Sequence, residues 1–171
     1  MNETGERQPE TEKPPLFYHA SANRHLERLE PRAETVRDEA EGAVVFATPE
    51  KDLASTFMLP KDDSWSASGR VNGRAFALFA DRDKFAALDH GGTLYVLPAE
   101  SFGRDDRDEH HRSEWTSQEA VVPIERIDYD SALTAMQENG VRVHFVDAAT
   151  LAEFQRANPE RKVEMLDQLG A

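Results

Sequence analysis

The sequence contains no cysteine among its 171 residues. Disulfide bonds and thiolate metal sites are therefore excluded, and a cytoplasmic location is the default expectation because structural disulfides are rare in that compartment. Long apolar runs are missing too, since none approaches the roughly 18 residues that a membrane-spanning helix needs. Residues 1–15 (MNETGERQPETEKPP) lack the apolar segment of a secretory signal. We therefore expect no membrane span and no secretory signal.

The sequence has few basic residues compared with acidic ones. Lysine and arginine number 20 against 33 acidic residues, which gives a formal net charge of −13. Nucleic-acid affinity depends largely on cationic contacts to phosphates, so we discount DNA or RNA as a bulk partner, although a local basic groove stays open. The acidity fits adaptation to a salty cytoplasm and also fits a simple solubility device.

Glycine clusters between a strand and a helix are also missing, which excludes a phosphate-binding loop of the Walker or Rossmann type. No internal repeat occurs at the usual periods of repeat proteins. With 39% hydrophobic and 31% charged residues, the composition indicates a soluble globular chain, and the length fits one domain with a real core. We predict a disordered tail at residues 1–15 and a single domain at residues 16–171.

The expected secondary structure mixes short strands with short helices. Strands are predicted by apolar runs or alternation at 16–20, 43–47, 74–80, 91–98, 141–147 and, broken near Pro123, within 114–129. Helices are predicted at 81–89 with Asp81 as cap, at 130–139 closed by Gly140, at 149–157 and at 159–170. Irregular chain is expected at 22–41, and loops at 60–73 and 103–113. This irregular order favours the α+β class over a regular βαβ winding.

Residues 42–58 are predicted to form a strand that leads into a short helix. Thr48 is suited to cap that helix, and Pro49 is suited to its first position. Ala54 then places a small residue on the inward face, with Phe57 at helical spacing on the same side. Taken alone, this segment is most simply explained by packing.

The stretch LFYHAS (16–21) ends an apolar strand in His19 and Ser21. Two interpretations compete for it. The strand either surfaces and meets a turn, or it delivers a polar pair to the floor of a ligand site. The stretch itself does not decide between the two.

A second candidate is EWTS (114–117), which starts an apolar strand directly after a charged loop. Trp115 gives Glu114 a partly desolvated setting that could raise the pKa of its carboxyl group, whereas the simpler interpretation is a solvated charge at a sheet edge. The preceding DEHHR (108–112) keeps a metal-dependent hydrolase open as a third hypothesis, because His111 and Glu114 could chelate a cation if the segment is helical. We expect a solvated loop there and no metal.

In their order along the chain, LFYHAS, GAVVFATPEKDLASTF and EWTS resemble the motifs of the ADP-ribosyltransferase fold, nearest the diphtheria-toxin-like branch that includes the poly(ADP-ribose) polymerases. That family's pattern is L-x-x-H-G-[ST], then G-x-Y-F-A with a short helix, then a late E-[YW] strand. The resemblance covers about residues 16–122. It implies two small antiparallel or mixed sheets around a cleft, with short flanking helices. The whole chain also resembles uncharacterised prokaryotic proteins with similar blocks, which adds no activity.

The resemblance implies that the partner of the chain is a small-molecule nucleotide, NAD, from which it transfers ADP-ribose to an acceptor. His19 and Ser21 would hydrogen-bond the ribose on the adenosine side, and the backbone at Ala20 would hold the nicotinamide carboxamide. Glu114 would bond the 2′-hydroxyl of the reacting ribose and stabilise an oxocarbenium-like transition state. Glu119 is the alternative carboxylate. Neither the acceptor nor the oligomeric state follows from the sequence.

The chain departs from the family at two positions, with Val45 in place of a stacking tyrosine and Ala20 in place of a glycine. Tyr18, Phe46 or Phe57 could supply the missing aromatic wall. The departure leaves open a non-catalytic module of the same fold that binds a nucleotide or a protein. A related fold member, the NAD-using RNA 2′-phosphotransferase, would need arginines on phosphate. The available ones are Arg24, Arg32 and Arg70.

Overall fold

The computed structural model describes residues 13–31, 43–103 and 114–170. Residues 104–113 of the predicted loop and most of the predicted tail lie outside these ranges. The strands within them are β1 (Leu16–Ser21), β2 (Val45–Ala47), β3 (Ser66–Val71), β4 (Arg74–Phe79), β5 (Gly92–Pro98), β6 (Phe102–Gly103), β7 (Trp115–Ser117), β8 (Glu125–Tyr129) and β9 (Arg142–Phe145). The helices are α1 (Lys51–Ser55), α2 (Arg82–Leu88), α3 (Ala132–Glu138), α4 (Ala148–Arg156) and α5 (Pro159–Leu169). None of these helices could cross a membrane, being too short or too polar.

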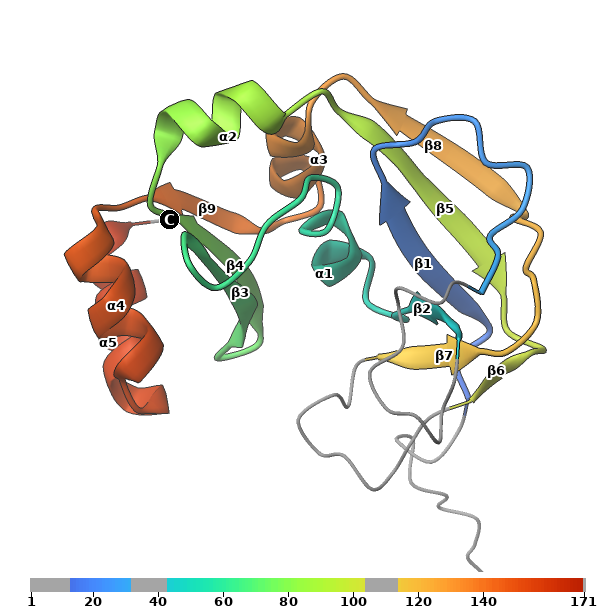
Figure 1. Cartoon of the computed structure of the whole chain (residues 1–171). Helices are drawn as coiled ribbons and strands as arrows, with labels where there is room; N and C mark the ends of the chain where they lie inside the picture. The colour runs from blue at the N-terminus through green and yellow to red at the C-terminus, as the bar shows by residue number, and fades with distance from the viewer. Residues whose placement is uncertain (1–12, 32–42, 104–113, 171) are drawn as a thin grey trace, which may run out of the picture.

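The described strands form three sheets, each of three strands, in the orders β1–β5–β8, β2–β7–β6 and β3–β4–β9 (Figure 1). The mixed α+β class is therefore confirmed. The expectation of two sheets is wrong, because the described chain builds a third. Pairing is antiparallel except between β4 and β9, which run parallel.

The strand β3 lies where the sequence predicted a loop, and that prediction is wrong. Its residues, SASGRV, carry no apolar alternation, so hydrophobicity could not reveal it. The strand forms because β4 offers it a full antiparallel ladder from Ser66–Phe79 to Val71–Arg74. Asn72 and Gly73 close the hairpin with φ values of 55° and 81°, which is the two-residue turn that Asn-Gly favours.

The helix α1 begins later than predicted. Its N-cap is Glu50, not Thr48, and Pro49 precedes the helix. The reason is that Thr48 is held in a backbone bridge to Tyr18, with N···O distances of 2.8 and 3.1 Å. The bridge keeps Thr48 extended. Its Oγ1 accepts a hydrogen bond from the N–H of Glu50, at 3.1 Å, and Glu50 is the residue that precedes the first turn of the helix. By contrast, the predicted Asp81 cap of α2 is confirmed, since its side chain accepts from Lys84 N.

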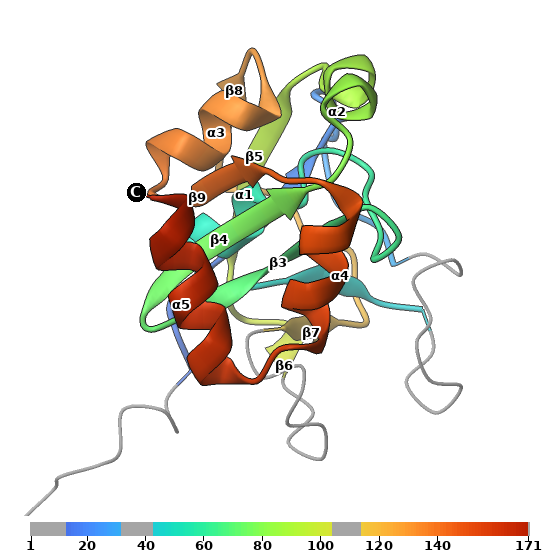
Figure 2. The same cartoon turned by 90° about the vertical axis from the view of Figure 1, so that its left-hand side faces the viewer.

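Two helices, α1 and α3, help to fill the space between the sheet of β1 and the sheet of β4, while α4 and α5 cover the opposite face of the latter (Figures 1 and 2). The strand β4 shows why both faces are covered. Ala75, Ala77 and Phe79 belong to the core cluster that contains α1 and α3. Phe76 and Leu78, on the alternate face, pack with α4 and α5.

His144 on β9 gives the fold a pH dependence. Burial lowers the pKa of His144 below its ordinary value of 6.5, the backbone of Gly170 partly offsets this, and Arg142 and Arg74 lower it further. Between the two pKa values the unfolded chain binds more protons than the fold does. We therefore expect the free energy of unfolding to decrease as the pH falls below 6.5. Urea unfolding at pH 7.5 and 5.5 measures this decrease, which His144→Gln should reduce; an equal decrease in both proteins would contradict it.

Candidate functional site

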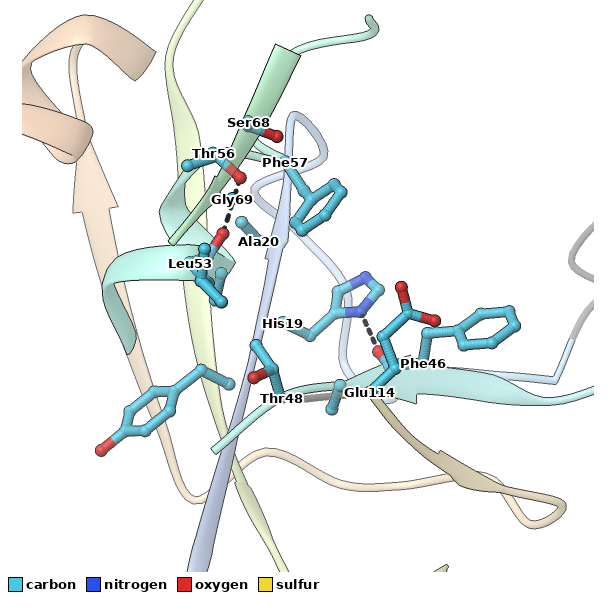
Figure 3. Close-up of a pocket in the computed structure, with 13 residues that line it drawn as sticks. His19, Ala20, Phe46, Thr48, Leu53, Thr56, Phe57, Ser68, Gly69 and Glu114 are labelled. Carbon is cyan, nitrogen blue, oxygen red and sulfur yellow. Dashed lines mark hydrogen bonds between the residues drawn. The ribbon is translucent and has the colours of Figure 1, made fainter. Parts of the chain in front are cut away.

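A pocket of about 670 Å³ opens between β1, β2, α1 and β3, beside the first residue before β7 (Figure 3). Its lining residues are Tyr18, His19, Ala20, Phe46, Ala47, Thr48, Leu53, Ala54, Thr56, Phe57, Ser68, Gly69 and Glu114. The volume lies in the range of about 300–1,000 Å³ that is typical of small-molecule sites.

The three stretches singled out in the sequence meet at this pocket. The bridge between Tyr18 and Thr48 joins β1 to the end of β2. The β2–β7 ladder then pairs Ala47 with Trp115, which sets Glu114 next to that bridge. Backbone pairing alone thus brings segments distant in the sequence to one place.

His19 projects from β1 into the pocket and is fixed by a hydrogen bond. Its Nδ1 lies 2.7 Å from the carbonyl oxygen of Phe46 on β2 (Figure 3). Because a carbonyl oxygen only accepts, Nδ1 must donate, and a neutral His19 carries its lone pair on Nε2. The sheet contact therefore selects the tautomer and sets the orientation of the ring.

Glu114 immediately precedes β7, is half-buried and lines the same pocket as His19. In Figure 3 its carboxylate and the His19 imidazole occupy the same end of the pocket. Glu119, the alternative carboxylate, is exposed and is not one of the lining residues. The N–H of Glu119 donates to Ser117 Oγ at 3.1 Å, which holds this residue in the turn after β7.

Two predicted site residues do not line the pocket. Val45 is 3% exposed and packs in a core cluster with Phe17 and Trp115. Ser21 ends β1, where its Oγ accepts from the N–H of Asn23 at 3.0 Å. Successive side chains of a strand point to opposite faces, so burying Val45 turns the next side chain, Phe46, towards the pocket.

Three aromatic residues are among those that line the pocket: Tyr18 of β1, Phe46 of β2 and Phe57 of the turn after α1. Phe57 is 54% exposed, an unusual state for so large an apolar side chain. Ala20 is another of the lining residues, and its methyl group adds to the apolar surface. The pocket therefore offers flat apolar walls although Val45 faces elsewhere.

Sequence reasoning missed Ser68 and Gly69, because the segment that carries them was predicted to be a loop. The Asn72-Gly73 pair could have revealed the hairpin, since it marks a tight two-residue turn. Thr56 was missed as well. Its Oγ1 donates to the carbonyl oxygen of Leu53 at 2.7 Å (Figure 3), which ties this wall of the pocket to the last turn of α1.

An ion cluster joins the two walls formed by β3 and α1. Arg70 Nε donates to Glu50 at 2.7 Å and Arg70 Nη2 donates to Asp52 at 2.6 Å. The hydrogen bond to Asp52 is the main cause of the raised pKa of Arg70, and Glu50 adds to it. The positive charge of Arg70 is thus already neutralised by protein carboxylates.

Among the described residues, neither a phosphate site at the other candidate arginines nor a metal site is found. Arg24 donates to the carbonyl oxygen of His90 at 2.8 Å and does not line the pocket, and Arg32 lies outside the described residues. The segment 108–112 is outside them too, and the described residues contain no group of three or more possible metal ligands. Comparison of the chain with protein-family models, curated proteins and solved structures gave no match.

Proposed function

We propose that the pocket binds NAD and that the protein transfers ADP-ribose from it to an acceptor, as an ADP-ribosyltransferase-like enzyme. One observation carries the proposal: His19, Glu114 and three aromatic residues line a single pocket of about 670 Å³. These are the groups that cleavage of a nicotinamide riboside requires, namely a polar anchor, a flat wall and a carboxylate.

The reaction breaks the bond between ribose C1′ and the nicotinamide nitrogen. The bonding electron pair leaves with the nitrogen, so neutral nicotinamide departs and positive charge develops on the ribose, as in glycoside cleavage. Glu114 would stabilise that charge and accept a hydrogen bond from a ribose hydroxyl. The acceptor's nucleophile then bonds to C1′, which neutralises the cation, and its proton is released to solvent. Electrostatic stabilisation of this kind is often the largest single contribution to rate.

His19 and the aromatic side chains would position the substrate. With Nδ1 donating to Phe46, the Nε2 of a neutral His19 can accept from a ribose hydroxyl. Phe46 and Phe57 offer faces on which the nicotinamide ring could stack, and such aromatic pairs contribute about 0.5–1.5 kcal/mol. Tyr18 neighbours His19 on β1, so its side chain points to the other face of the strand and packs against the core. Positioning of the reacting bond by such groups lowers the entropic part of the barrier.

The first test is NAD binding by the purified full chain. We expect millimolar NAD to raise the melting temperature, because a ligand that binds only the native state stabilises it. Chromatography should also detect nicotinamide release. His19→Ala should weaken NAD binding about tenfold, the effect of losing one hydrogen bond, whereas His25→Ala in the exposed loop should not. The proposal fails if wild-type protein shows no stabilisation at millimolar NAD.

A non-catalytic nucleotide- or protein-binding module of the same fold is the alternative. It is favoured by Ala20, whose methyl group lines the pocket where the family pattern has a glycine. A Cβ at this position narrows the space next to the ligand. This alternative predicts binding of NAD or ADP-ribose without nicotinamide release.

A further inference from the structure

Lys61 lies between α1 and β3, at the rim of the pocket. Its Nζ donates to Ser68 Oγ at 3.1 Å and stands 4.4 Å from the centre of the Phe57 ring. Ser68 and Phe57 both line the pocket. The ammonium group therefore borders the pocket through two of its lining side chains.

The surroundings of Lys61 are unusual for a cation in a chain with a net charge of −13. Its side chain is half-buried, and burial lowers the pKa of Lys61 while Asp63 partly offsets this effect. Its contacts within the described ranges are a neutral hydroxyl and an aromatic ring, with no carboxylate in ion-pair contact. A desolvated charge without a paired opposite charge is unfavourable. An anionic group on a ligand would compensate that cost.

Arg70 shows the contrast on the same wall. It follows Gly69 on β3, but Glu50 and Asp52 already occupy its guanidinium. Lys61 has no such carboxylate partner among the described residues, and it borders the pocket through Ser68 and Phe57. Because Ser68 accepts from Lys61, its own hydroxyl proton can be donated to the same anion.

We propose that Lys61 and Ser68 form a phosphate-binding subsite, and that the pocket therefore selects nucleotides that carry phosphate over nucleosides. In Figure 3, His19 and Glu114 lie at one end of the pocket, Ser68 lies towards the other end, and Phe57 lies between them. A nucleotide that extends from His19 to the Ser68 end of the pocket would bring its phosphates beside Lys61. The identity of the nucleotide as NAD rests on the proposed function, whereas the phosphate subsite does not.

The test is isothermal titration of the full chain with NAD, ADP and adenosine. Lys61→Gln should raise the Kd for NAD and for ADP by about 10- to 100-fold, as expected for a lost charge-assisted hydrogen bond. The Kd for adenosine should stay within about twofold, and Lys61→Arg should retain most of the affinity. Lys84→Gln is the matched control. Lys84 also lies over an aromatic ring, 4.9 Å from the centre of Trp65, but Trp65 does not line the pocket, whereas Phe57, the ring beside Lys61, does.

The outcomes separate the subsite from the proposed function. Equal Kd values for ADP in wild-type and Lys61→Gln protein would overturn the subsite, even if NAD binds. Loss of ADP binding in Lys61→Gln, together with no NAD binding by wild-type protein, would support the subsite and overturn the proposed function. Absence of binding by both nucleotides would overturn both.

Salt dependence gives a second measurement that needs no variant, in case Lys61→Gln does not fold. Screening weakens contacts between charges, so raising the salt concentration should increase the Kd of wild-type protein for ADP but not for adenosine. An equal response of the two ligands to salt would overturn the subsite.

Discussion

Replacing Glu114 with glutamine is expected to lower the rate of nicotinamide release from NAD by about 10²- to 10³-fold, the usual effect of removing one preorganised electrostatic group. Glutamine keeps the size and shape of the side chain but removes the negative charge that would stabilise the developing cation. NAD binding should change little, because the substrate in its ground state lacks that developing charge. Turnover is measured by chromatography, and binding by isothermal titration.

Glu119→Gln is the matched control for Glu114. The two carboxylates lie near each other in the sequence, but only Glu114 lines the pocket, so Glu119→Gln should leave turnover unchanged. A rate for Glu114→Gln equal to that of wild-type protein would contradict the proposed role. Binding of NAD by wild-type protein without any nicotinamide release would instead favour the non-catalytic module.

Phe17→Ala is expected to lower the free energy of unfolding by about 3–5 kcal/mol, the usual cost of truncating a buried phenylalanine. The side chain is 0% exposed. Its ring centre lies 4.9 Å from that of Phe102 and 5.1 Å from that of Trp115. These contacts pack β1 against the sheet that carries Phe46 and adjoins Glu114. Urea unfolding followed by circular dichroism measures the loss.

Leu16→Ala is the control for Phe17. Leu16 precedes it on the same strand and is 37% exposed, so its truncation should change the free energy of unfolding by no more than about 0.5 kcal/mol. Similar losses for the two variants would show that the aromatic cluster contributes less than its burial implies. If the Phe17→Ala variant binds NAD more weakly at temperatures where it stays folded, the packing of β1 against this sheet is needed to hold the pocket in its binding geometry.

Much of the fold could be predicted from local patterns. The strands β4 and β5 are continuous apolar runs, and α2 starts at a side chain that can cap it, Asp81. Gly140 follows α3 with a φ of 87°, as expected because helices often end at a glycine with positive φ. Each of these features depends on neighbours in the sequence, which is why composition and spacing reveal them.

The strand β3 could not be predicted from hydrophobicity, because its stability comes from β4 and not from its own residues. Because of this error, Ser68 and Gly69 were not among the predicted site residues. Ser68 is also the side chain that accepts the hydrogen bond from Lys61. The start of α1 was misplaced for a similar reason. A long-range bridge to Tyr18 holds Thr48 extended, and no local pattern reports such a bridge.

The sequence by itself determined an α+β class, a large negative charge and a short set of candidate residues that included His19 and Glu114. Only the tertiary structure decided that these two share a pocket, that Phe46 faces it while Val45 turns into the core, and that Ser21 stands apart. The physical reason is that side-chain direction depends on strand pairing and register. Those depend on partners far away in the chain, whereas composition and periodicity are properties of neighbours.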